Sequence, residues 1–125
     1  MSSFENLSRK LHIYENTPSY ELVFKVKADY YFRCNDYQTA LNYYSKSAGK
    51  MREKNPKKST IYFNLGVLYY YLKDKNNAIN YMQKAADHFQ MINEERSSYN
   101  FHKRNNILAK KSNLARYVIK QIQNN

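Results

Sequence analysis

Residues that could do chemistry are few in this sequence, and they are widely separated. Histidine occurs at His12, His88 and His102, none of them in an HExxH pattern or beside a cysteine. Such isolated histidines lack the spacing of metal ligands. The chain has 2 glycines and no GxxxxGK[ST] or GxGxxG pattern, which argues against a phosphate-binding loop. We therefore expect no catalytic residue, no metal site and no cofactor.

The single cysteine, Cys34, has no partner for an internal disulfide, and its place at a predicted helix end favours a packing role. The first ten residues lack the apolar core of a secretory signal. No apolar run is long enough for a membrane span, so no membrane partner is expected. Together these features predict a cytoplasmic protein.

Positive charge dominates the chain, with 21 Lys and Arg against 10 Asp and Glu. No acidic residue follows Glu95. The predicted basic patch on this last segment comprises Lys103, Arg104, Lys110, Lys111, Arg116 and Lys120. A surface of this kind attracts anionic partners, nucleic-acid phosphates included. A solvated helix face is the simpler interpretation, so nucleic-acid binding is the less favoured alternative.

An internal repeat organises the sequence. Asp36 matches Asp74 at an offset of 38 residues (74 − 36), and Ala40 matches Ala78 at the same offset. The further identities at this offset are Tyr31 with Tyr69, Asn42 with Asn80, Tyr43 with Tyr81, Lys46 with Lys84 and Ala48 with Ala86. A period of this length is typical of stacked two-helix units.

The breaks between helices follow from local chemistry. Thr17 can cap a helix that takes Pro18 in its first turn, and Asp36 can cap the next one. Pro56 forces Asn55 out of the helical region. We predict one all-α domain over 1–125, with a leading helix at 4–15, repeat 1 at 18–54, repeat 2 at 57–93 and a basic C-terminal helix at 97–123.

Small and large residues alternate where the helices of repeat 2 should cross. Tyr62, Leu65, Gly66 and Tyr69 share one side of the first helix, and Ala78, Met82 and Ala85 share the facing side of the second. This pattern resembles the tetratricopeptide repeat (TPR) family, whose motif places an aromatic, Leu-Gly and Tyr before Ala, an aromatic and Ala. Repeat 1 resembles it through Phe24, Ala28, Tyr31, Ala40 and Tyr44, and departs from it at Lys27 and Ser47.

The resemblance implies an α-α superhelical repeat with about two TPR-like helical hairpins, a short N-terminal helix and a long C-terminal capping helix. Within the family, 24–82 is similar to the repeats of bacterial Rap-type peptide-sensing regulators. The additional repeats and effector domain of those regulators have no counterpart in the sequence, so their activities are not carried over. The implied function is that of a protein- or peptide-binding scaffold or regulatory module without catalytic activity.

In the family, ligands bind the concave side, which is lined by the first helix of each repeat. The resemblance places these partner-binding groove residues there: Lys25, Asp29, Phe32, Arg33, Phe63, Asn64, Val67, Tyr70 and Tyr71. Asn64 could hydrogen-bond a peptide backbone, and Phe63 and Tyr70 would be apolar anchors. The alternative is that these residues pack against neighbouring helices or the C-terminal segment.

The C-terminal segment carries an apolar stripe at helical spacing. Its members are Ile107, Leu108, Leu114, Ala115, Val118, Ile119 and Ile122. Two repeats alone are marginally stable, so we expect this stripe to cap the array. It could instead pair with a second copy and form a homodimer.

Overall fold

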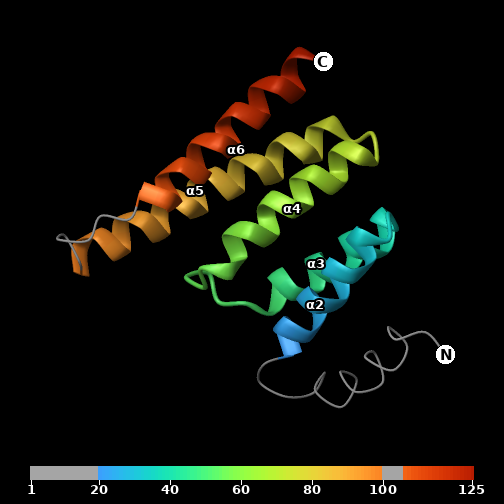
Figure 1. Ribbon diagram of the computed structural model, residues 1–125, viewed down its shortest axis with the longest axis horizontal. Helices are drawn as coiled ribbons and strands as arrows, with labels where there is room; N and C mark the ends of the chain where they lie inside the picture. Colours follow the sequence, from blue (N-terminus) through green and yellow to red (C-terminus); the bar gives the residue numbers. More distant parts are fainter. Residues whose placement is uncertain (1–19, 100–105) are drawn as a thin grey trace. The chain divides into compact units, whose positions relative to one another are not determined.

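The computed structural model describes residues 20–99 and 106–125, which contain helices and no strand. The helices are α2 (Tyr20–Arg33), α3 (Tyr37–Lys50), α4 (Lys57–Tyr71), α5 (Lys75–Tyr99) and α6 (Asn106–Asn124) (Figure 1). The chain divides into two compact units, 1–51 with α2 and α3, and 52–125 with α4, α5 and α6. The all-α repeat fold is confirmed, whereas the leading helix predicted at 4–15 lies outside the described residues.

Both helical hairpins turn in the same way. Asn35 and Lys73, 38 residues apart (73 − 35), adopt positive φ angles of 61° and 67°. The amide of Asp36 then donates to the carbonyl of Tyr31 at 3.0 Å, which satisfies a group left over at the end of α2. Asp74 makes the equivalent bond in the second hairpin, at 2.9 Å. This is a Schellman turn, which closes a helix and reverses the chain within a few residues.

The residue after each left-handed turn starts the next helix. The Asp36 carboxylate accepts a hydrogen bond from the Thr39 amide at 3.4 Å, and the Asp74 carboxylate accepts one from the Asn77 amide at 3.1 Å. A short acidic side chain at this position satisfies an amide that has no partner within its own helix. The predicted cap at Asp36 is confirmed, and Asp74, where only a turn was predicted, caps α5 in the same way.

The unit formed by α2 and α3 is held by small residues at the crossing and one buried tyrosine. Ala28 and Ala40 are fully buried, and Tyr44 is almost so. The hydroxyl of Ser47, also buried, donates to the carbonyl of Glu21 at 2.5 Å. This bond explains the departure from the TPR pattern at Ser47, because the hydroxyl ties α3 to the first turn of α2.

In the second unit, α4 and α5 approach most closely at Gly66. A Cβ atom placed there would lie 2.8 Å from the Cε of Met82 and 3.2 Å from the carbonyl oxygen of Ala78. Leu65, Met82 and Ala78 are fully or almost fully buried around this point. The predicted interdigitation of small and large residues at this crossing is confirmed.

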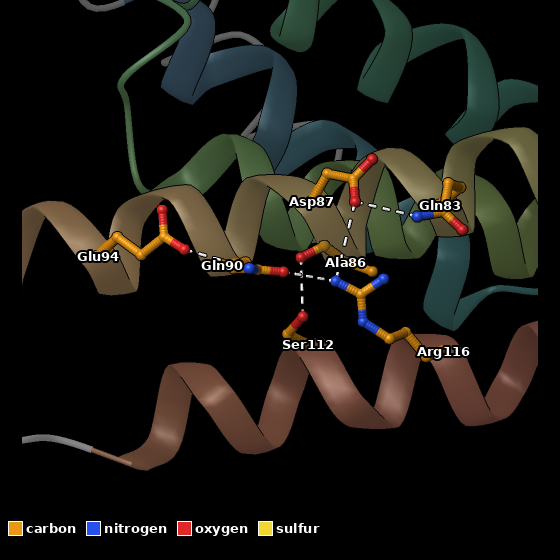
Figure 2. A network of polar contacts seen from close by, with 7 residues as sticks. All are labelled: Gln83, Ala86, Asp87, Gln90, Glu94, Ser112 and Arg116. Atoms are coloured by element: carbon orange, nitrogen blue, oxygen red, sulfur yellow. Dashed lines mark hydrogen bonds and ion pairs between the residues drawn. The ribbon is translucent and has the colours of Figure 1, made fainter.

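The helix α6 packs antiparallel on α5, and a set of polar contacts fastens the pair (Figure 2). The buried Ser112 hydroxyl donates to the carbonyl of Ala86 at 2.9 Å. Arg116 donates to the side-chain oxygen of Gln90 at 2.6 Å and lies 3.9 Å from the carboxylate of Asp87. Ala115, Ile119 and Ile122 bury the apolar side of α6.

Three helix boundaries differ from the sequence prediction. α3 ends at Lys50 rather than near residue 54, because Met51 is already extended, with φ −84° and ψ 146°. α5 continues to Tyr99 rather than 93, since no glycine or proline interrupts that stretch. The residues at 97–99 therefore belong to α5, and α6 begins only at Asn106.

Candidate functional site

A small apolar crevice opens among the three helices of the second unit. It is lined by Thr60 and Phe63 of α4, Phe89 of α5, and Lys111 and Leu114 of α6, and its volume is about 150 Å³. Almost all of its wall is carbon, because the methyl, phenyl and leucyl groups face it. A volume of this size accommodates one apolar side chain of a ligand, the kind of anchor that dominates protein–protein interfaces.

The two aromatic side chains that line the crevice, Phe63 and Phe89, are fixed by their packing against the core. Phe63 and Val67 of α4 rest against the buried cluster that contains Met82, Phe89 and Ala115. The ammonium of Lys111 lies 5.9 Å from the centre of the Phe89 ring, within the range of a cation–π contact. The crevice therefore combines fixed aromatic walls with a positive charge at one edge.

Leu114 is an exposed apolar part of the wall. It leaves 51% of its surface in solvent, whereas its neighbour Ala115 is fully buried against α5. A helix turns by about 100° per residue, so these adjacent side chains point to different sides of α6. Leu114 is thus placed to contact a ligand without being needed for the core.

Three of the four predicted groove residues of the first unit make their ionic or aromatic contacts within that unit. The ammonium of Lys25 forms a 2.9 Å ion pair with the carboxylate of Asp29, which also accepts a hydrogen bond from the hydroxyl of Tyr44. Phe32 packs edge-on against the rings of Tyr37 and Tyr44. Arg33 is exposed. Of this set, only the arginine presents its side chain largely to solvent.

The predicted groove residues of the second unit divide into two groups. Phe63 and Val67 are half-buried and face the core cluster beside the crevice, whereas Tyr70 and Tyr71 are exposed. The Tyr70 hydroxyl accepts a hydrogen bond from the Asn125 side chain at 3.0 Å, which ties the end of α4 to the end of α6. Asn64 is half-buried between these groups in sequence.

The predicted basic patch is only partly one surface. Lys110, Lys111 and Lys120 are exposed on α6, whereas Lys103 and Arg104 lie outside the described residues. Arg116 is half-buried and engaged with Gln90 and Asp87, as Figure 2 shows. Its role is therefore structural in part, and Lys110 and Lys120 are the cations of α6 that make no ion pair or cation–π contact with the described residues.

The apolar stripe predicted on the C-terminal segment is buried over most of its width and exposed along one edge. Ala115, Ile119 and Ile122 are buried and pack on α5, as expected for a cap. Ile107 and Leu114 are more than half exposed and lie on another side of the helix. The single stripe was wrong in part: Leu108 and Val118 also pack against the core cluster, and Ile107 and Leu114, at one edge of the stripe, are exposed. The buried half is not available to a second copy, and pairing through the exposed half stays a prediction.

Two residues with reactive side chains, Cys34 and His88, need separate description. Cys34 is exposed, so the packing role predicted for it is wrong. His88 is buried, where its Nε2–H donates to the carbonyl of Glu53 and its Nδ1 contacts the hydroxyl of Ser59. His88 therefore ties the loop before α4 to α5 through Glu53, and α4 to α5 through Ser59. Ser59 is fully buried and offers no accessible nucleophile.

Metal ligands and membrane spans can be judged only over the described part of the chain. Within 20–99 and 106–125, no group of three or more His, Cys, Asp or Glu side chains is placed to hold a metal ion. None of the helices in those same ranges combines the length and apolar character that crossing a bilayer requires.

Tyrosines stack in both units at the repeat offset. The rings of Tyr31 and Tyr43 lie 5.7 Å apart, and those of Tyr69 and Tyr81 lie 5.3 Å apart. Burial raises the pKa of Tyr69 above its ordinary value of 10.0, and the nearby Tyr81 and Asp74 raise it further. The pKa of Tyr31 is raised by the same first cause.

Sequence reasoning missed two walls of the crevice. Phe89 and Thr60 gave no signal, since each reads as an ordinary helix residue. Leu114 was assigned to the buried stripe, although its position 100° from Ala115 on the helix could have separated the two. Lys111 was identified, but as a member of the basic patch.

Comparison with known proteins places the fold in a family. A family model described as tetratricopeptide repeat matches residues 23–91, which is more than half of the chain and spans both hairpins. The chain matched no curated protein and no solved structure. The matched residues include the helix crossing at Gly66, the Schellman turns and the capping aspartates described above. The chain belongs to the tetratricopeptide repeat family.

Proposed function

We propose that this chain is a protein-binding scaffold that holds a partner through the crevice lined by Phe63, Phe89 and Leu114. TPR repeats generally mediate protein–protein interaction, and the family match carries that general role to this chain. The observation that supports the specific site is the exposed leucine at the mouth of an apolar crevice with fixed walls. Covering a water-exposed leucine with a partner removes apolar surface from water, which makes the free energy of binding more favourable.

The site is suited to a protein chain rather than to a small metabolite. Its wall has few polar atoms, and a small polar substrate needs several convergent hydrogen-bonding groups to be oriented. An apolar side chain of a partner needs only shape and the exclusion of water. The crevice is accordingly an anchor point within a larger contact surface, and no catalytic step is assigned to it.

Quantitative affinity enrichment tests this role. The wild-type chain, Leu114→Glu and the control Asn80→Glu would each be expressed in the cells that naturally make the protein, and retained proteins would be compared by mass spectrometry. Both variants add one negative charge to an exposed position of the second unit, but Asn80 belongs to α5 and does not line the crevice. We expect a defined partner that is lost from Leu114→Glu and retained by Asn80→Glu. An identical set of proteins with all three chains would contradict the proposal.

A further inference from the structure

The helix α6 exposes an apolar stripe of its own. Ile107, Leu114 and Tyr117 leave 55%, 51% and 59% of their surfaces in solvent. At 100° per residue they fall within one side of the helix, away from Ala115 and Ile119, which face α5. An ordinary surface helix has one apolar stripe and one polar side, so a second exposed stripe marks a contact surface.

This stripe is continuous with the crevice. Leu114 belongs to both, because its side chain lines the crevice together with Phe63 and Lys111. The stripe therefore extends the anchor point along the length of α6, which has 19 residues. A ligand that fills the crevice with one side chain can place further apolar side chains on Ile107 and Tyr117.

Lysines are interleaved with the stripe. Lys110 stands between Ile107 and Leu114, Lys111 lies one turn before Leu114, and Lys120 follows Tyr117 by one turn. All three lysines are exposed, and α6 contains no Asp or Glu. The fourth cation, Arg116, is occupied by Gln90 and Asp87 of α5. Lys110 therefore lies within the apolar stripe, and Lys111 and Lys120 lie on its two sides.

We propose that the occupant of this stripe is an acidic amphipathic helix of a partner protein, whose apolar residues meet Ile107, Leu114 and Tyr117 and whose carboxylates meet the lysines. A helix lays its apolar face into such a surface through side chains one turn apart. Carboxylates opposite Lys110 and Lys120 would neutralise charges that α6 itself leaves without an acid. The inference rests on the proposed function, since it names the class of partner for the same site.

Charge also argues against the other occupants. A second copy of α6 would bring two sets of the same lysines together with no carboxylate on either helix, which costs free energy. A nucleic acid would satisfy the lysines, but bases stack on aromatic rings and gain little from Ile107 or Leu114. The acidic helix is the one occupant that uses both the apolar and the charged parts.

Fluorescence anisotropy with designed peptides on the full chain tests the inference. Four peptides of 19 residues, the length of α6, would be compared. Three share one leucine stripe and differ only in surrounding residues, which are Glu, Gln or Lys, and the fourth is a scrambled form of the Glu peptide. We expect the Glu peptide to bind at least about tenfold more tightly than the Gln or the scrambled peptide. Added salt should reduce the difference in affinity between the Glu peptide and the Gln peptide, because salt screens the attraction between charges.

Variants connect the binding to the stripe. Lys110→Glu with Lys120→Glu should reverse the preference, so that the Lys peptide binds best. The control pair Lys50→Glu with Lys84→Glu changes the charge equally at exposed positions outside α6 and should keep the Glu preference. Leu114→Glu should weaken the Glu peptide about tenfold or more.

Each other outcome would overturn the inference. Equal binding of the Glu and Gln peptides, still weakened by Leu114→Glu, would reject the acidic partner and leave the protein-binding crevice standing. If the scrambled peptide bound as tightly as the Glu peptide, charge attraction alone would account for the binding, and the apolar stripe would have no part in it. An oligonucleotide that binds more tightly than every peptide and depends on Leu114 and Lys110 would assign the surface to nucleic acid. If no peptide binds, the inference fails, and the enrichment experiment with Leu114→Glu decides the proposed function separately.

Discussion

Leu114 of α6 and Phe63 of α4 line one crevice, although they belong to different helices and neither is fully buried. The two are brought together because both α4 and α6 pack on α5. This relationship separates the binding role from the folding role along α6. Leu114 faces the crevice and solvent, whereas Ala115 faces α5.

Glutamate at the adjacent positions 114 and 115 should destabilise the fold to very different extents. Ala115→Glu places a charge in the interface with α5 and should lower the free energy of unfolding by roughly 3 kcal/mol or more. Leu114→Glu removes a half-exposed side chain and should cost about 1 kcal/mol or less. Urea unfolding monitored by circular dichroism measures both values. Equal losses in the two variants would show that Leu114 is a core residue.

The two glycines should respond to alanine in opposite directions. At Gly66 a methyl group would press on Met82 and on the Ala78 carbonyl, so Gly66→Ala should destabilise the protein by about 1–2 kcal/mol. At Gly49 nothing lies within 4 Å of the new methyl group, and Gly49→Ala should stabilise α3 by about 0.5–1 kcal/mol. Thermal unfolding compares them directly. A stabilising Gly66→Ala would mean that α4 and α5 are less closely packed than described.

Replacing Lys73 with glycine should stabilise the fold. Its φ of 67° lies in the left-handed region, where a side chain costs roughly 1 kcal/mol. Lys73→Gly should therefore raise the free energy of unfolding by about 0.5–1 kcal/mol. Asn35→Gly in the equivalent turn should gain less, because asparagine tolerates this conformation. Denaturant midpoints measure both variants, and a loss of stability in Lys73→Gly would contradict the turn geometry.

Stability should fall at alkaline pH partly through Tyr69. Its pKa is raised in the folded state, mainly by burial, so the unfolded chain loses the phenol proton first as pH rises. The stabilisation is complete below the ordinary pKa of 10.0 and is lost as pH rises through the higher folded value. Tyr69→Phe should therefore lose less stability than wild type between about pH 9 and 11. The free energy of unfolding of the two proteins would be measured by urea unfolding at several pH values. If it fell equally steeply with pH in both, ionisation of Tyr69 would be excluded as a cause of the lost stability.

The repeat architecture was predictable because its signals are local. The aspartates 38 residues apart, the paired small residues and Pro56 each act within one turn or one crossing, and a single sequence displays them. The end of α3 at Lys50 and the extension of α5 to Tyr99 were not predictable from these signals. Gly49 lies within the last turn of α3 rather than just after it, and no glycine or proline stands beside Tyr99, so neither boundary carries the usual stop signal of a helix.

The crevice was less predictable than the fold because it depends on which helix covers which. Phe63 was identified as a groove residue from its repeat position, but its partners Phe89 and Leu114 come from α5 and α6. The pairing of Lys25 with Asp29 was also missed, although opposite charges four residues apart on one helix are expected to pair. Contacts between different helices, such as those that form the crevice, are absent from helical periodicity.

Site-specific photo-crosslinking at Thr60 tests the central claim most directly, that the crevice binds a partner protein. A photoreactive amino acid in place of Thr60 sits at the edge of the crevice, and the same group in place of the exposed Gln38 of α3 is the control. In cells that naturally make the protein, we predict a discrete protein adduct from position 60 that disappears when Leu114→Glu is added and persists with Asn80→Glu, at an exposed position of α5. The absence of any adduct beyond that of position 38, or an adduct unchanged by Leu114→Glu, would contradict the claim.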